Sequence, residues 1–64
     1  MIKVKTFTNQ LQIFRTAHEL EELDREVNKF IEETGVSRVI AVSDTTTAGE
    51  GDTVGIIRVL TYEK

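Results

Sequence analysis

The first segment of the chain alternates apolar and polar side chains over residues 2–7. In an extended chain, successive side chains point to opposite sides, so the pattern predicts a strand with one charged side. The two sides are Ile2, Val4 and Thr6 on one, and Lys3, Lys5 and Phe7 on the other.

The next segment, residues 8–15 (TNQLQIFR), fits three interpretations. It forms a second short strand, an extension of the first strand, or an ordered loop. Leu11, Ile13 and Phe14 are too apolar to leave in water, so we expect the segment to dock on the rest of the protein.

Residues 17–34 have the apolar spacing of an amphipathic helix. Apolar or small side chains recur at steps of three and four residues and form one stripe: Ala17, Leu20, Leu23, Val27, Phe30, Ile31 and Thr34. Thr16 and Glu19 match a capping box, in which each side chain bonds a backbone amide at the start of the helix. Gly35 stands where helices often end in a left-handed residue.

Residues 36–46 and 53–62 are rich in β-branched side chains, which favour strands. Between them lie Gly49 and Gly51, which adopt positive φ values at little cost. The pattern predicts a long β-hairpin that turns at these glycines.

The hairpin carries two sets of side chains, one for each face of the sheet. The smaller set consists of Val39, Ala41, Ser43, Gly55, Ile57, Val59 and Thr61. The larger set consists of Arg38, Ile40, Val42, Asp44, Val54, Ile56, Arg58, Leu60 and Tyr62. Because small side chains let a helix approach closely, we expect the helix on the face of the smaller set.

The larger set would then lie on the face away from the helix, where an antiparallel sheet normally shows polar residues. An exposed apolar patch of this kind marks an interface or a ligand site. We therefore expect another subunit to cover it; the alternative is that TNQLQIFR folds back over it. In the first case, Ile56→Lys or Leu60→Lys should break the assembly without unfolding the monomer.

Length and composition limit the classes of function. A chain of 64 residues forms one domain, residues 1–64, and is marginal as a monomer. With no cysteine and one histidine, it lacks disulfides and the usual zinc ligands, so we expect no metal, no cofactor and stabilisation by oligomerisation. The net charge of −3 disfavours nucleic acid as a partner. No signal peptide and no apolar run of roughly 18 residues occurs, so we expect a cytoplasmic protein without membrane contact.

The best candidate for a ligand site is a basic and aromatic set on the predicted sheet. Arginine and lysine beside an apolar floor suit a small planar anion. The candidate ligand-binding residues are Lys3, Lys5, Arg38, Arg58 and Tyr62. The alternative is that these cations form interface salt bridges with acidic residues of a neighbouring helix.

No catalytic residue is predicted. His18 fits an exposed helix histidine better than a general base, which needs a cleft and an orienting partner. Residues 43–47 and 50–52 have the hydroxyls, carboxylates and glycines to hold a cation or a phosphate, but ordinary turn hydrogen bonds explain them better. Their spacing matches neither a P-loop nor an EF-hand.

Two protein families resemble the chain in the order of their elements. IKVKTF, ELEELDREVNKFIEE and RVLTYEK are similar to the first strand, the acidic helix and the last strand of short sporulation-associated proteins of spore-forming bacteria and their phages. That resemblance implies no established activity. The strand-helix-strand-strand order is also similar to that of the dodecins, hollow homo-oligomers that store flavin. The chain has no tryptophan to stack on a flavin, so this second resemblance implies an architecture only.

These observations predict an α+β protein of β-α-β-β order, a three-stranded sheet with one helix packed on one face. The favoured function is a non-enzymatic homo-oligomeric module, in which a small anionic ligand is a candidate partner at a subunit interface. The alternative is a sporulation- or phage-related adaptor or regulatory protein that binds one partner protein.

Overall fold

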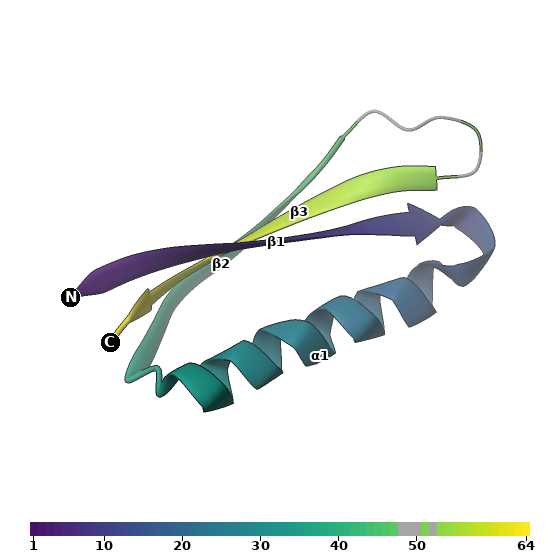
Figure 1. Cartoon of the computed structure of the whole chain (residues 1–64). Helices are drawn as coiled ribbons and strands as arrows, with labels where there is room; N and C mark the ends of the chain where they lie inside the picture. Colours follow the sequence, from purple (N-terminus) through teal and green to yellow (C-terminus); the bar gives the residue numbers. More distant parts are fainter. Residues whose placement is uncertain (48–50, 52) are drawn as a thin grey trace.

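Residues 1–47, 51 and 53–64, which the computed structural model describes, form three strands, a short 3-10 helix and one α-helix (Figure 1). In chain order these are β1 (Ile2–Gln12), η1 (Ile13–Arg15), α1 (Thr16–Thr34), β2 (Arg38–Thr46) and β3 (Thr53–Glu63). β3 lies in the centre of the sheet and pairs antiparallel with β1 on one side and with β2 on the other. The predicted α+β class, the β-α-β-β order and the packing of the helix on one face are confirmed.

β1 is longer than the alternating pattern of residues 2–7 indicated. It continues to Gln12 and pairs with β3 along its whole length. The strand extension is therefore the correct interpretation for residues 8–12, and the segment does not fold back over the sheet. Leu11 packs against the core. Phe14 is 91% exposed, so the expectation that it docks on the protein was wrong.

α1 begins one residue earlier than predicted and ends where predicted. Thr16 has helical dihedral angles of φ −57° and ψ −46°, so it is not the N-cap that a capping box requires, and that expectation was wrong. Its hydroxyl donates to the Gln12 carbonyl oxygen at 3.0 Å. At the other end, Gly35 has a φ of 71° and its amide donates to the Ile31 carbonyl oxygen. Side chains with a Cβ rarely adopt this φ, so Gly35 ends the helix as expected.

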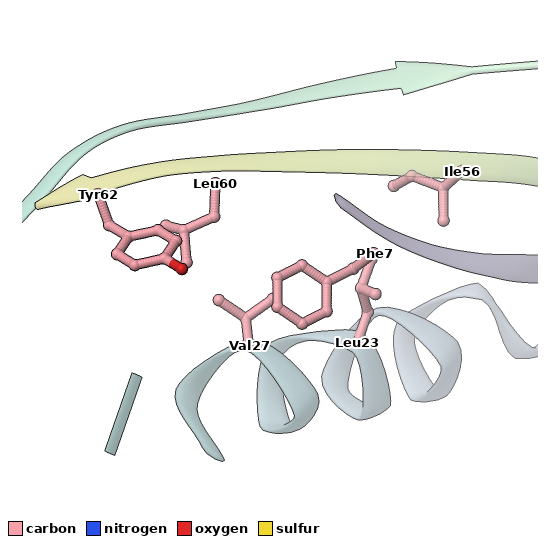
Figure 2. Packing of buried hydrophobic residues seen from close by; sticks show 6 residues of the cluster. All are labelled: Phe7, Leu23, Val27, Ile56, Leu60 and Tyr62. Carbon is pink, nitrogen blue, oxygen red and sulfur yellow. The ribbon is translucent and has the colours of Figure 1, made fainter. Parts of the chain in front are cut away.

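The core lies between α1 and one face of the sheet. Among the described residues, six buried side chains fill it (Figure 2): Phe7, Leu23, Val27, Ile56, Leu60 and Tyr62. Leu23 and Leu60 are completely buried. Around them pack Leu20, Phe30 and Ile31, which belong to the apolar stripe predicted for the helix.

The larger set of β3 side chains faces the helix, which reverses the expected arrangement. Ile56, Leu60 and Tyr62 point toward α1 (Figure 2), so Gly55 and Val59 point to the opposite face. Large side chains remove more apolar surface from water, at about 25 cal/mol per Å², and this gain outweighs the close approach that small residues permit. We call the face that α1 packs on the inner face and the opposite one the outer face.

An irregularity in β2 changes which of its residues share a face. Val39 lies opposite Tyr62, and Ala41 lies opposite Thr61, so β2 has one extra residue between these two pairs, as in a β-bulge. Val39 therefore lies on the inner face together with Val42. Strict alternation had placed Val39 with Ala41, and that grouping was wrong.

α1 leaves β2 uncovered. All nine residues of β2 are exposed, including Val39, Ile40 and Val42. The chain measures 41 × 19 × 12 Å, and its radius of gyration of 12.9 Å exceeds the roughly 11 Å expected of a compact chain of this length. An isolated copy is thus a thin slab that shows water its outer face and the inner side of β2.

The position of Leu60 predicts a large effect on stability. Leu60→Ala should lower the free energy of unfolding by about 2–5 kcal/mol, because it leaves a cavity in the core. Leu60→Lys should unfold the chain, since it buries a charge without a partner. Thr61→Ala, the next residue on the outer face, is the control and should change stability by less than about 0.5 kcal/mol. Urea denaturation followed by circular dichroism makes the comparison; a folded Leu60→Lys monomer would contradict the core assignment.

Candidate functional site

The five residues predicted to bind a ligand do not form one cluster. Four of them lie on the inner face: Lys3, Lys5, Arg58 and Tyr62. Arg38 lies at the start of β2 on the outer face, opposite Glu63. Its guanidinium donates to the Glu63 carboxylate at 2.9 Å. An exposed pair of this kind adds little stability, but it neutralises the charge of Arg38.

Lys5 and Tyr62 both lie beside Phe30 of α1. The Phe30 ring packs edge-on against Phe7, with centroids 5.7 Å apart, and against Tyr62, with centroids 5.3 Å apart. The Lys5 ammonium lies 5.8 Å from the Phe30 centroid and 5.9 Å from the Phe7 centroid. At this distance a cation is attracted by an aromatic ring. The Tyr62 ring is buried in the core, so it supports the fold rather than an open ligand site.

Arg58 is the centre of a charged cluster that joins β3 to β2 and α1. Its Nε and Nη2 donate to the two carboxylate oxygens of Asp44 at 2.8 and 3.0 Å, and its Nη1 donates to the Asp24 carboxylate. The two parallel bonds to Asp44 are the strongest geometry for a guanidinium and a carboxylate. We call these three residues the Arg58 cluster.

The Arg58 cluster shows its carboxylates to solvent and hides its cation. The Arg58 side chain is 12% exposed, whereas those of Asp24 and Asp44 are 59% and 43% exposed. Two carboxylates and one guanidinium leave a charge of −1. A molecule that approaches the cluster therefore meets a negative surface.

The contacts in the cluster hold its charges in place. The hydrogen bonds from Arg58, reinforced by its charge, lower the pKa of the Asp44 carboxyl below its usual value. The hydrogen bond to Asp44, assisted by that to Asp24, raises the pKa of Arg58 further above its already high value. Asp44 and Arg58 are therefore both ionised at neutral pH.

A hollow of about 390 Å³ lies between α1 and the inner side of β2. We call it the α1–β2 groove. Its lining residues are Asp24, Val27, Asn28 and Ile31 of α1, and Val42, Asp44 and Arg58 of the sheet. Val27, Ile31 and Val42 form its apolar part, and the Arg58 cluster forms its polar part. The groove exists because α1 does not extend over β2.

The outer face carries almost no charge. Strand pairing and alternation assign to it Ile2, Val4, Thr6, Thr8, Gln10, Gln12, Arg38, Ala41, Ser43, Thr45, Thr53, Gly55, Ile57, Val59, Thr61 and Glu63. Only Arg38 and Glu63 of this set are charged, and they bond each other. A second hollow, of about 540 Å³, lies around Gly55 and is lined by side chains that include Thr8 and Thr47. None of its described lining residues is a cation, so it does not suit an anion.

The remaining sequence candidates carry no site among the described residues. The His18 side chain is 54% exposed and its Nε2 lies 3.9 Å from the Glu22 carboxylate, as expected of a surface histidine. In the hairpin turn, Gly51 has the expected positive φ, at 61°. Residues 48–50 and 52, which include the predicted turn candidates Gly49, Glu50 and Asp52, lie outside the described residues. The described part of the chain contains no group of three or more side chains able to hold a metal ion.

Sequence reasoning missed the partners of Arg58 and the α1–β2 groove. The sequence did contain a signal for the partners of Arg58. Ile56, Arg58 and Leu60 share one side of an otherwise apolar strand, and a charged side chain in such a place needs a partner. Asp44 lies directly opposite Arg58 in the hairpin, so the register would have identified it. Asp24 and the groove depend on where the helix lies across the sheet, which the sequence pattern did not indicate.

Comparisons with family models, with curated proteins and with solved structures gave no match. The two family resemblances noted from the sequence therefore stay predictions. No helix in the described part of the chain is long and apolar enough to cross a membrane. The geometry of the inner and outer faces is the basis for the function proposed below.

Because of the Asp44–Arg58 pair, we expect the stability of the fold to depend on pH in the acidic range. The pKa of Asp44 is lower in the folded chain than its ordinary value of 3.8, so the pair stabilises the fold above that pH and ceases to do so as the pH falls through the folded-state pKa. We expect the free energy of unfolding to fall less steeply between neutral pH and about pH 3 for Asp44→Asn than for the unchanged chain. Urea denaturation at both pH values measures this. Glu33→Gln, at an exposed acid of α1, is the control; equal slopes for Asp44→Asn and the unchanged chain would contradict the prediction.

Proposed function

We propose that this protein is a non-enzymatic module that assembles with copies of itself through the outer face of its sheet. The observation that carries the proposal is the lack of unpaired charge on this face, in a chain of which 30% of the residues are charged. The interface expected from the sequence thus moves from the larger set of side chains, whose β3 members α1 covers, to the opposite face.

The composition of the outer face is that of a surface ready for contact. Antiparallel sheets that keep one face in water normally place charged side chains there, and these also discourage association. Val4, Ile57 and Val59 instead supply apolar area, and Ile2 and Val4 are well exposed. Six further residues of this face, Thr6, Thr8, Ser43, Thr45, Thr53 and Thr61, carry hydroxyls, which rotate to find a hydrogen-bond partner.

The outer face is also large enough for a specific contact. β3 has 11 residues, which span about 36 Å at about 3.3 Å each, and three strands spaced by about 4.8 Å are about 14 Å wide. Two such faces stacked on each other would cover about 500 Å² of each copy and about 1,000 Å² in total, which is the lower limit for a specific interface. Sheets stacked in this way are the normal architecture of β-sandwiches.

A second copy of the chain is the occupant that the charges favour. Each copy has a net charge of −3, and α1 is rich in acidic residues, so most approaches bring like charges together. Two outer faces meet without that repulsion. A face that contacts itself across a two-fold axis is also the commonest way in which identical subunits associate.

Fewer of the predicted ligand-binding residues are available to an anion than the sequence suggested. Arg38 and Arg58 already bond carboxylates of their own chain. Lys3 and Lys5 lie on the inner face of β1, and no ion pair of either is found among the described residues. We therefore propose these two lysines, rather than the interface, as the binding site for a small anionic ligand.

Val59→Lys tests the assembly. It places a charge near the middle of the outer face, where a lone copy can direct the long side chain into water but two stacked faces cannot. We expect a single oligomer for the unchanged chain at micromolar concentration, and a folded monomer for Val59→Lys. Sedimentation velocity and native mass spectrometry measure the state, with circular dichroism to establish folding.

Val42→Lys is the matched control, because Val42 is exposed on the inner face and the substitution is the same. It should leave the oligomer intact. A monomeric unchanged chain, or an oligomer that survives Val59→Lys, would refute assembly through this face.

A further inference from the structure

The α1–β2 groove lies directly beside an unpaired strand edge. Within the described residues, β2 pairs with β3 on one side only, so its other edge shows backbone groups to solvent. An edge of this kind is a template for a further strand. The groove would receive the side chains that such a strand directs to the inner face.

The hydrogen-bond pattern of the sheet determines which backbone groups are outward. The Thr47 amide donates to the Gly55 carbonyl oxygen at 2.9 Å, and bonded and non-bonded pairs alternate along an antiparallel ladder. Residues 41, 43 and 45 therefore bond β3, whereas the N–H and C=O groups of Val42, Asp44 and Thr46 point to the unpaired edge. These three are also the residues whose side chains lie on the inner face, so edge and groove coincide.

The other edge of the sheet lacks this combination. α1 packs over β1, where Phe7 is buried, and the Lys5 ammonium lies over the rings beside it. By the same alternation, the outward backbone groups of β1 belong to outer-face residues such as Val4 and Thr6. In a strand added to β1, the residues that bond these backbone groups would direct their side chains to the outer face. They would point away from α1, and no groove beside the helix would receive them.

We propose that β2 binds an extended segment of a partner protein, which adds to the sheet as an antiparallel strand and places alternate side chains along the α1–β2 groove. This is the mode by which several domain classes recognise peptides, where backbone bonds supply affinity and pockets for alternate side chains supply specificity. The antiparallel direction is the more stable pairing. The inference is independent of assembly through the outer face, because it uses the other face and the edge.

The groove specifies the chemistry of two positions in the partner. The residue opposite Val42 would lie beside Val27 and Ile31, so an aliphatic side chain fits there; Val42 is 51% exposed and has area to contribute. The residue opposite Asp44 would face the carboxylates of the Arg58 cluster, so lysine or arginine fits there. In an antiparallel strand the residue opposite Asp44 comes first, which gives the order basic, any residue, aliphatic.

The volume of the groove agrees with this reading. About 390 Å³ is within the range of about 300–1,000 Å³ found for ligand pockets. The negative part of the groove also explains why a partner segment is favoured over another copy of β2. The only cation of β2, Arg38, lies on the outer face and is bonded to Glu63, so a second β2 brings no basic side chain to the groove.

The test is a titration of the isotope-labelled full chain with the capped peptide GTTKTVTG, followed by nuclear magnetic resonance. In the antiparallel register its lysine lies opposite Asp44 and its valine opposite Val42. We expect saturable shifts of the amide resonances of Val42, Asp44 and Thr46, and slower hydrogen exchange at the same amides. The peptide GTTETVTG, with glutamate in place of lysine, should bind about tenfold more weakly or worse, because it brings like charges together.

Two variants separate the groove from the rest of the strand. Val42→Lys should weaken binding of GTTKTVTG about tenfold or more, because it places a charge opposite the peptide valine, two residues from the peptide lysine of like charge, and fills the apolar part of the groove. Val39→Lys is the matched control, since Val39 has similar exposure, 42%, and the same face, but does not line the groove. It should leave the affinity unchanged, as should Val59→Lys on the outer face.

Three results would overturn the proposal. The first is an absence of saturable shifts, and the second is equal affinity for Val42→Lys and Val39→Lys. The third is slow hydrogen exchange of the Val42, Asp44 and Thr46 amides in the protein alone, with a rate that falls further as the protein concentration rises. That result would assign the edge to a second copy. If Val59→Lys abolishes assembly and leaves peptide binding unchanged, both proposals are supported. The two proposals are tested by different variants, so either one can fail without the other.

Discussion

α1 does not cover the whole of its three-stranded sheet, and most of this structure follows from that incomplete cover. A helix is about 10 Å across, and three strands occupy about 14 Å with their side chains extending beyond. α1 lies over β1 and β3, so the six core residues come from these three elements and none comes from β2. No element of the described residues covers the outer face. The protein thus has a small core, one half-covered face and one open face.

The elements of the fold were predictable, whereas their orientation was not. The apolar stripe and Gly35 located α1 almost to the residue, and the β-branched runs located the hairpin. Alternation also showed correctly which β3 residues share a face. It did not show which of the two faces meets the helix, because both carry enough apolar side chains, and the close-approach argument chose the wrong one. The bulge between Val39 and Ala41 then changed the alternation in β2, and nothing in that stretch marks it.

The candidate site shows a similar division between composition and geometry. The sequence pattern indicated a basic and aromatic set of five residues on the sheet, and four of them, all but Arg38, do share the inner face. Their availability depends on neighbours that lie far away in the sequence: Glu63 for Arg38, and Asp24 for Arg58. The Arg58 cluster ties the helix, the central strand and the exposed strand together at the border of the core.

The central strand of the sheet is the last of the three along the chain. Among the described residues, β1 and β2 do not pair with each other, and each pairs with β3. During synthesis, neither has its partner until residues 53–63 have left the ribosome, and Leu60 and Tyr62 of the core are made after the helix that they pack on. The helix can form earlier, but until β3 is made it has only β1 to pack on. The sheet therefore forms in one step that joins distant parts of the chain, which is the kind of topology that folds slowly for its size.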